Sequence, residues 1–257
     1  MKKYIIILFS VLILLVGCSR SVSVLSDKNP SDTKLEWGLK KNENKAPDIN
    51  PGEESVLRKY NGIYMGNPEK SFVYLTFDEG YENGYTAKIL DTLKEKKVPA
   101  CFFVTGPYIE KEPNLIKRMV KEGHIVGNHT VNHPSMPSCT DEEIEDEITS
   151  LERSFYDLTG KSMKFFRPPM GEHSERTMKI TKDLGYKTVF WSLAYADWDI
   201  NRQPGRDYVH EAVTKYIHNG AVILMHAVSA DNAAELPSII DDVRKMGYEF
   251  NSLDKLK

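Results

Sequence analysis

The sequence predicts an α/β fold built on a parallel sheet or barrel. After Lys70, short apolar and β-branched runs alternate with longer helical patterns, as in repeated β–α units. Runs such as Ala221–Met225 (AVILM) are apolar throughout, which indicates strands that are buried on both faces of a sheet. Four of the runs end in polar side chains. In such folds, functional groups gather where strands end and loops begin.

The individual elements follow from this alternation. The expected strands lie at 72–77, 100–104, 124–126, 165–166, 188–192, 221–225 and 248–250. The expected helices lie at 85–96, 114–122, 141–158, 175–184, 206–218 and 233–245. Thr140, followed three residues later by Glu143, predicts a capping box at the start of the long helix.

The first residues indicate export. Two lysines precede an apolar run that ends at Gly17 and is too short to span a bilayer comfortably. The residues Leu15-Val16-Gly17-Cys18 resemble the lipobox of bacterial lipoproteins, which implies a signal peptide over 1–17 and a lipid on Cys18. The alternatives are an uncleaved signal anchor or an ordinary secretory leader. Residues 18–69 are expected to be a lipid-anchored tether and N-terminal flank, with Trp37 docked on the folded domain at 70–257.

Composition excludes several classes of protein. Apolar residues make up 40% of the 257, enough for a core and too few for a polytopic membrane protein. With a net charge of −3, the chain has no general attraction for nucleic acid, and no such partner is expected. Three cysteines cannot form a disulfide framework. We interpret Cys101 and Cys139 as unpaired.

The polar residues at the strand ends suggest one hydrolytic site. Asp78 and Glu79 follow the first strand, and His129 and His133 follow the third. The histidine spacing predicts one helical turn on which both rings face the same way and share a divalent metal. Each group alone also fits a turn, a surface pair or a buried polar residue. A barrel would bring them to one rim together with two further residues, Arg167 and His226.

In this order, the motifs TFDEG, HTVNH, RPPMG, ADW and LMH resemble the polysaccharide deacetylase family, which comprises the family 4 carbohydrate esterases with a NodB homology domain. The resemblance covers 70–257 and implies a deformed (β/α)7-type barrel that hydrolyses acetyl groups on a sugar polymer. The segments WGLKK, YLTFDEGYENGYTAKIL, HTVNHPSMP and WSLAYADWD are similar to the delta-lactam-biosynthetic de-N-acetylases of spore-forming bacteria. Those enzymes act on muramic acid of spore-cortex peptidoglycan after an amidase has removed the stem peptide.

The resemblance also implies residue roles. Asp78 matches the general base, Arg167 the arginine that orients it, and His226 the general acid. Asp197 matches the aspartate that pairs with this acid. A divalent metal ion, zinc or another transition metal, is expected on His129, His133 and Glu79, the last standing where most of the wider family has an aspartate. The other departure from that family is Ala194 in place of the first aspartate of a DxxDW motif. A backbone N–H of the Pro169–Met170 turn is a candidate oxyanion donor.

The leading functional hypothesis is therefore de-N-acetylation of muramic acid in peptidoglycan by a lipid-anchored enzyme that faces the cell wall or the forming spore cortex. One alternative is an N-acetylglucosamine deacetylase acting on peptidoglycan, chitin or another glycan. Another is a catalytically inactive glycan-binding lipoprotein. Candidates for the sugar cleft are Tyr81, Tyr85, His173 and Trp198, with Trp191 in the core and Arg202 or Arg206 at the substrate carboxylate.

Overall fold

A curled parallel sheet forms the centre of the molecule in the computed structural model, which describes residues 30–256. Its strand order is β10-β4-β5-β6-β7-β9, and β11 also pairs with β4. The strands are β4 (Phe72–Glu79), β5 (Ala100–Val104), β6 (Ile125–Asn128), β7 (Phe165–Phe166), β9 (Lys187–Thr188), β10 (Val222–His226) and β11 (Glu249–Phe250). A single bridge between Leu193 and Ile223 joins the region after β9 to β10. The predicted deformed barrel is confirmed.

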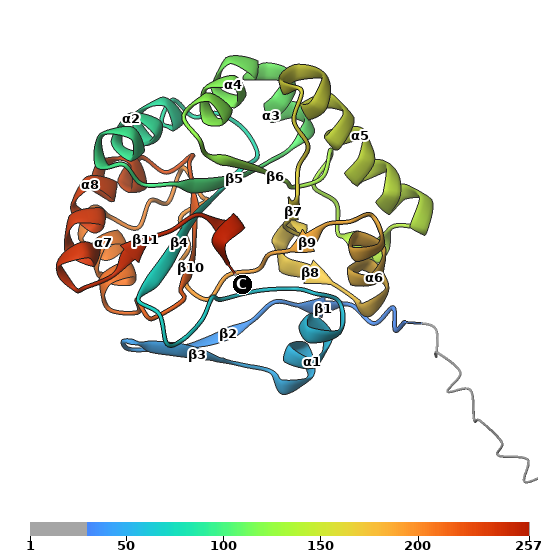
Figure 1. Ribbon diagram of the computed structural model, residues 1–257, viewed down its shortest axis with the longest axis horizontal. Helices are drawn as coiled ribbons and strands as arrows, with labels where there is room; N and C mark the ends of the chain where they lie inside the picture. Colours follow the sequence, from blue (N-terminus) through green and yellow to red (C-terminus); the bar gives the residue numbers. More distant parts are fainter. Residues whose placement is uncertain (1–29, 257) are drawn as a thin grey trace, which may run out of the picture.

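Seven helices surround the sheet on its outer side (Figure 1). They are α2 (Thr86–Lys96), α3 (Gly106–Lys111), α4 (Pro113–Lys121), α5 (Asp141–Thr159), α6 (Glu175–Asp183), α7 (Arg206–Thr214) and α8 (Ala230–Lys245). The capping box predicted for the long helix is present: Thr140 Oγ1 accepts from the Glu143 N–H, and the Glu143 carboxylate accepts from the Thr140 N–H. Helix α3 was not predicted from the sequence.

The core lies between the sheet and these helices. All but the first residue of β4 are buried, as expected for a central parallel strand. Inside the core, Phe77 stacks on Phe102 of the neighbouring strand with ring centroids 5.1 Å apart. Strand register then fixes the polar end of the sheet, because His226 on β10 pairs directly with Asp78 on β4.

From residue 30 onward, the segment predicted as a tether and N-terminal flank is folded. It comprises β1 (Leu35–Glu36), β2 (Leu39–Asn42), β3 (Lys45–Ile49) and α1 (Pro51–Lys59), and it runs along one side of the barrel (Figure 1). β1 pairs with β8 (Glu172–His173). The predicted docking of Trp37 is confirmed, since its ring is buried against Phe190 and its Nε1 donates to the Trp191 carbonyl at 2.9 Å.

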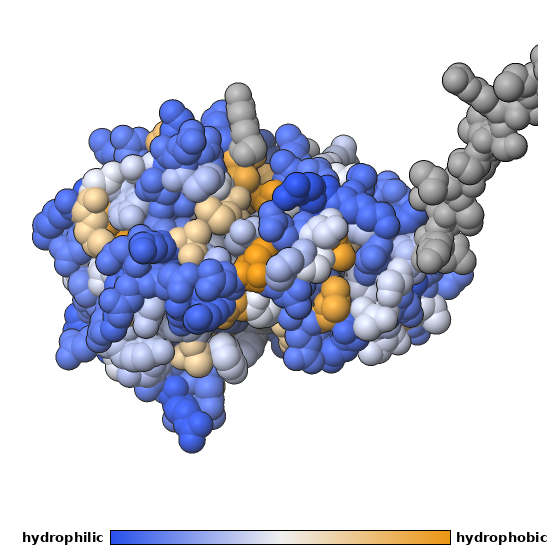
Figure 2. Space-filling model, turned by 90° about the horizontal axis from the view of Figure 1, so that it is seen from below, coloured by the Kyte–Doolittle hydropathy of each residue, from blue (hydrophilic) through white to orange (hydrophobic). Residues whose placement is uncertain are grey.

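The predicted signal peptide at 1–17 and the lipidated Cys18 lie outside the described residues. Within residues 30–256, no helix combines the length and apolar character needed to cross a bilayer. On the face shown in Figure 2, apolar side chains gather in small groups among hydrophilic ones. The two remaining cysteines, Cys101 and Cys139, are unpaired, as predicted.

Candidate active site

The carboxyl ends of four strands deliver the candidate site residues to one place. Asp78 is the penultimate residue of β4, and His226 ends β10 beside it. His129 follows β6 directly, and Arg167 follows β7 directly. Because the strands are parallel, all four residues reach the same rim of the barrel, which is the arrangement that the sequence predicted.

Arg167 is fully buried and holds Asp78 in place. Its Nη1 donates to Oδ1 of Asp78 at 2.7 Å, and its Nη2 donates to Oγ1 of Thr76 at 2.9 Å. The guanidinium also stacks on the Phe103 ring, 4.2 Å from its centroid. Burial alone would raise the pKa of Asp78, but the charges of Arg167, His129 and His226 outweigh it and lower that pKa below its ordinary value. Asp78 is therefore ionised at neutral pH.

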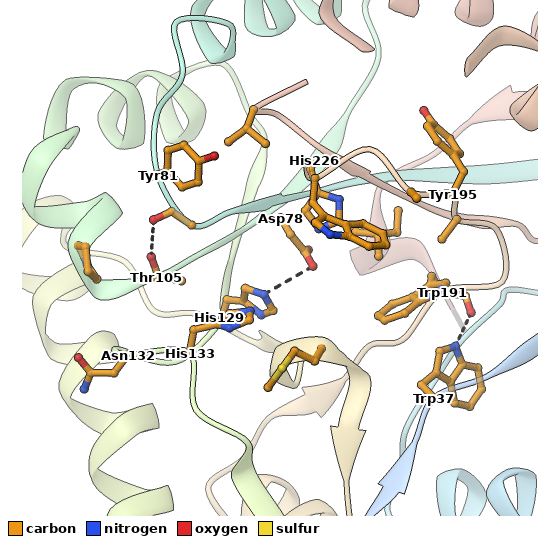
Figure 3. Close-up of a pocket in the computed structure, with 18 of the residues that line it drawn as sticks. Trp37, Asp78, Tyr81, Thr105, His129, Asn132, His133, Trp191, Tyr195 and His226 are labelled. Atoms are coloured by element: carbon orange, nitrogen blue, oxygen red, sulfur yellow. Dashed lines mark hydrogen bonds and ion pairs between the residues drawn. The ribbon is translucent and has the colours of Figure 1, made fainter. Parts of the chain in front are cut away.

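His129 presents a bare nitrogen to Asp78. Its Nδ1 lies 2.8 Å from the Arg167 carbonyl oxygen, and since a carbonyl can only accept, Nδ1 carries the proton. Burial lowers the pKa of His129 to about 4, although the charge of Asp78 acts in the opposite direction. The unprotonated Nε2 lies 3.5 Å from Oδ2 of Asp78 (Figure 3). Two hydrogen-bond acceptors thus lie next to each other, and a group with two donor hydrogens could bond to both from the cleft.

His133 lies beside His129, with ring centroids 4.8 Å apart. The helical turn predicted from their spacing is wrong, because residues 129–133 form an irregular turn in which Thr130 and His133 have positive φ angles of 67° and 58°. The Thr130 hydroxyl accepts from the His133 N–H at 2.9 Å and closes this turn. The two imidazoles therefore meet as predicted, but a loop brings them together.

Glu79 does not join the histidine pair. Its side chain is fully buried and accepts from the Thr86 hydroxyl at 3.4 Å, and Tyr108 in turn donates to Thr86. Adjacent residues of a strand point to opposite faces, so Asp78 faces the cleft while Glu79 faces the helices. Burial, followed by the nearby charge of Glu82, raises the pKa of Glu79 well above its ordinary value. The structure thus gives no support to Glu79 as a third metal ligand.

The residues present do not fit a three-ligand metal centre. Family 4 carbohydrate esterases are generally metal-dependent, and the buried His129 and the more exposed His133 supply two neutral imidazoles of the kind that bind zinc. Across residues 30–256, however, no group of three His, Cys, Asp or Glu side chains is placed to hold a metal ion. Zinc sites in proteins ordinarily use at least three protein ligands.

A second buried network orients His226. The Asp197 carboxylate accepts from His226 Nδ1 at 2.6 Å, from the His226 backbone N–H at 2.8 Å and from Asn232 Nδ2 at 2.6 Å. Tyr195 donates its hydroxyl to Oδ1 of Asn232 at 2.9 Å. Burial lowers the pKa of His226, but hydrogen bonding and charge from Asp197 more than compensate and raise it above its ordinary value. The protonated ring thus has Nδ1 engaged, which leaves Nε2 for the cleft.

Sequence reasoning missed Asn232 and Tyr195. Asn232 occupies the first turn of α8, where Ser229 caps the helix by accepting from the Asn232 N–H. An asparagine next to a helix start is ordinary, so nothing in the sequence separated it from a structural residue. Its role becomes visible only because the start of α8 lies directly after the strand that ends in His226.

A cleft of about 970 Å³ is lined by Asp78, His129, His133 and His226. Two of the predicted sugar-contacting residues, Tyr81 and Trp198, line it and are exposed. Trp191 was expected in the core but also lines the cleft (Figure 3). The other two predicted residues do not: Tyr85 packs against the core, and His173 is fully buried with Nδ1 facing the Gly171 carbonyl.

The two arginines predicted to meet a substrate carboxylate lie outside the cleft lining. Neither Arg202 nor Arg206 lines the cleft, and Arg206 pairs instead with Glu235 at 2.8 Å. The folded flank supplies part of the wall through three residues, Trp37, Leu39 and Lys41. Ala194 and Met170 are also in the wall, Met170 in a turn with a left-handed φ of 58°.

An ionised carboxylate and a protonated histidine, each fixed by a buried partner across one cleft, form the site of an acid–base hydrolase. A model of the family described as polysaccharide deacetylase matches residues 65–189. The chain belongs to this family, and the predicted hydrolase class is confirmed.

Individual relatives support this membership. The chain is 47% identical over 224 residues to the peptidoglycan-N-acetylmuramic acid deacetylase PdaA of Bacillus subtilis, covering 86% of this chain and 85% of that protein. The solved structure of PdaA, described as a family 4 carbohydrate esterase, superposes with a TM-score of 0.86 at 46% identity, covering 88% of this chain and 97% of the other. A peptidoglycan-N-acetylglucosamine deacetylase of Bacillus cereus is 34% identical over 206 residues, 79% of this chain and 74% of that protein.

Proposed function

We propose that this protein removes the N-acetyl group of muramic acid in peptidoglycan, and that the freed amine closes on the lactyl carboxylate to give muramic δ-lactam in spore cortex. The observation that supports the chemistry best is that two ion pairs, Arg167–Asp78 and Asp197–His226, meet at one cleft. The substrate follows from the 47% identity to PdaA, whose name states N-acetylmuramic acid as its substrate.

The positions of the side chains assign each of them to a step of amide hydrolysis. A water placed beside these two acceptors, which are 3.5 Å apart, can donate one hydrogen to Oδ2 of Asp78 and the other to Nε2 of His129, and it keeps a lone pair free to attack the acetyl carbon. Asp78 takes the proton as the water attacks. His226 then donates the proton on Nε2 to the departing amine, since an amine leaves poorly unless it is protonated. Asp197 keeps the imidazolium in place for this transfer.

Cleavage of the amide produces acetate and a free amine on carbon 2 of the sugar. In ring closure the amine nitrogen forms an amide bond with the neighbouring lactyl carboxyl carbon, whose C–O bond breaks so that one oxygen leaves as water, and proximity favours this step. A stem peptide on the lactyl group would occupy that carboxylate, so we place the enzyme after a cell-wall amidase. Export and anchoring to the membrane through lipidated Cys18 belong to the same proposal. Labelling with a radioactive fatty acid, lost in Cys18→Ala, is the test of the anchor.

Product analysis tests the proposed substrate. Wild-type protein should release acetate from peptide-stripped glycan and leave the new amine on muramic acid, with little release from intact peptidoglycan. An amine found on glucosamine instead would favour the N-acetylglucosamine alternative, which the Bacillus cereus relative represents. Asp78→Asn should lower turnover by about 10²–10⁴-fold. Full turnover in this variant would overturn the assignment of the base, and a wild-type protein that binds glycan without releasing acetate would favour the inactive binding protein.

A further inference from the structure

The cleft wall holds a single unpaired cation at a fixed position. Among the described residues that line the cleft, Lys41 is the one lysine or arginine. Its side chain is half-buried, and its Nζ lies 5.4 Å from the centroid of the Tyr216 ring. Burial lowers the pKa of Lys41, and no carboxylate among residues 30–256 forms an ion pair with it within 4.0 Å.

A neighbouring lysine shows the contrast. Lys215 lies 5.8 Å from the centroid of the same Tyr216 ring, but its charge is balanced by Glu43 at 3.2 Å and Glu211 at 3.5 Å. A partly desolvated ammonium without such a partner gains most from an anion that arrives with a ligand. Lys41 is therefore built differently from the paired surface lysine beside it.

The flank holds Lys41 in place from both sides. On the N-terminal side, Trp37 is buried, and its backbone N–H donates to the Gly171 carbonyl at 3.1 Å. On the C-terminal side, the Asn44 N–H donates to the Lys215 carbonyl at 3.1 Å. The strand between these anchors is thus fixed to the barrel, and its ammonium reaches the cleft with little backbone freedom left to lose.

We propose that Lys41 selects substrates by binding a free lactyl carboxylate of the glycan strand in the cleft. This inference rests on the proposed muramic-acid substrate and names the group that recognises it. The cleft, at about 970 Å³, has room for more than one sugar, and each muramic acid without its stem peptide carries one such carboxylate. A peptide-linked lactyl group is an amide without charge at that position, and N-acetylglucosamine has no lactyl group, so neither offers Lys41 an anion.

The overall field of the protein cannot provide this selection. The chain carries a net charge of −3, which repels an anionic strand at long range and is screened beyond about 8 Å at physiological salt. A local cation is therefore needed if the enzyme is to favour glycan with free carboxylates.

The test compares two substrates in a charge-matched set of variants. The acidic substrate is a peptide-stripped, muramic-acid-containing oligosaccharide, and the neutral one is the same oligosaccharide with its lactyl carboxylates converted to methylamides. Lys41→Gln removes the cation. Lys40→Gln is the control, since Lys40 lies next to it on β2 but is exposed and outside the cleft lining. Lys41→Arg keeps the charge.

Loss of a charged hydrogen bond predicts that Lys41→Gln raises KM for the acidic substrate about 10- to 100-fold, with kcat within about twofold of wild type. On the methylamide substrate, wild type and Lys41→Gln should have the same KM, while Lys40→Gln should match wild type and Lys41→Arg should largely restore binding. Equal KM values for wild type and Lys41→Gln on the acidic substrate would overturn the assignment. That result is distinct from failure of the proposed function, which would appear as a wild-type product without amine on muramic acid.

Discussion

Replacement of Arg167 by methionine tests both the stability and the pH dependence derived for the site. Arg167 is fully buried, donates to Asp78 at 2.7 Å and to Thr76 at 2.9 Å, and also donates to the carbonyls of Val189 and Phe190. Methionine fills a similar volume but leaves the buried Asp78 carboxylate without its counter-charge. Breaking one side of a buried ion pair costs about 3–5 kcal/mol. At about 2–4 °C per kcal/mol for a chain of this size, Tm should fall by about 6–20 °C.

The same substitution should move the acidic limb of the pH–rate profile. Asp78 acts as a base only when it is ionised, so activity is lost as the pH falls through its pKa. In the wild type, burial raises this pKa, but the charge of Arg167 leads the effects that lower it below the ordinary value. Without Arg167 the pKa rises, and the acidic limb of kcat/KM shifts to higher pH. In the wild type, the lowered pKa of Asp78 stabilises the folded protein at pH values above the pKa of this carboxyl in the unfolded chain. Arg167→Met removes this contribution to the free energy of unfolding.

Calorimetry and acetate release measured between pH 4 and 9 provide the readouts. Arg167→Lys keeps the charge but not the forked geometry, so it should preserve more of the low-pH activity than methionine does. It also keeps the test usable if Arg167→Met does not fold. Arg58→Met is the matched control, because the Arg58 side chain is 80% exposed. An acidic limb that coincides in wild type and in both Arg167 variants would refute the role assigned to this residue.

Four further substitutions test other parts of the structure. Asp197→Asn removes the partner that outweighs burial and raises the pKa of His226, so the basic limb of the kcat profile should move to lower pH; an unmoved limb would contradict the acid assignment. Glu79→Gln removes a buried carboxyl whose pKa is raised in the folded protein. Wild-type stability therefore declines as the pH rises above the pKa that Glu79 has in the unfolded chain. The variant's stability relative to wild type, measured by urea unfolding, should therefore increase from pH 5 to pH 8. Calorimetric titration should also give Glu79→Gln the zinc affinity of wild type, whereas His133→Ala should weaken any binding. Trp37→Ala should cost about 3–5 kcal/mol in the same urea assay, and a loss below about 1 kcal/mol would show that the flank is not anchored through this ring.

The sequence predicts the site well where strand ends determine it. Asp78 and His226 each end an apolar run that only a buried strand explains, and parallel strands place such ends on one rim. The location of these groups therefore follows from pattern alone. The resemblance implied Glu79 as a metal ligand, whereas in the structure the Glu79 side chain points away from Asp78 and bonds to Thr86.

The remaining features depend on contacts that are distant in sequence. The flank has no sustained hydrophobic period, and its order comes from the barrel: Trp37 contacts Phe190 and Trp191, more than 150 residues away. The spacing of His129 and His133 also fits a helix, and only the positive φ angles at Thr130 and His133 show the loop. Asn232 acquires its role through Asp197, 35 residues earlier in the chain.

Because the flank is folded against the barrel, the catalytic side chains and part of the substrate-contacting wall come from two separate stretches of chain. The Asp78, Arg167 and His226 side chains come from the barrel, whereas part of the cleft wall, including Lys41, comes from β2, which contributes no strand to the barrel sheet. Selectivity can therefore change by substitution in a short hairpin while the reaction machinery stays the same. For protein engineering, exchange of residues 37–44 between deacetylases of this family is the smallest graft expected to transfer substrate preference without rebuilding a catalytic centre.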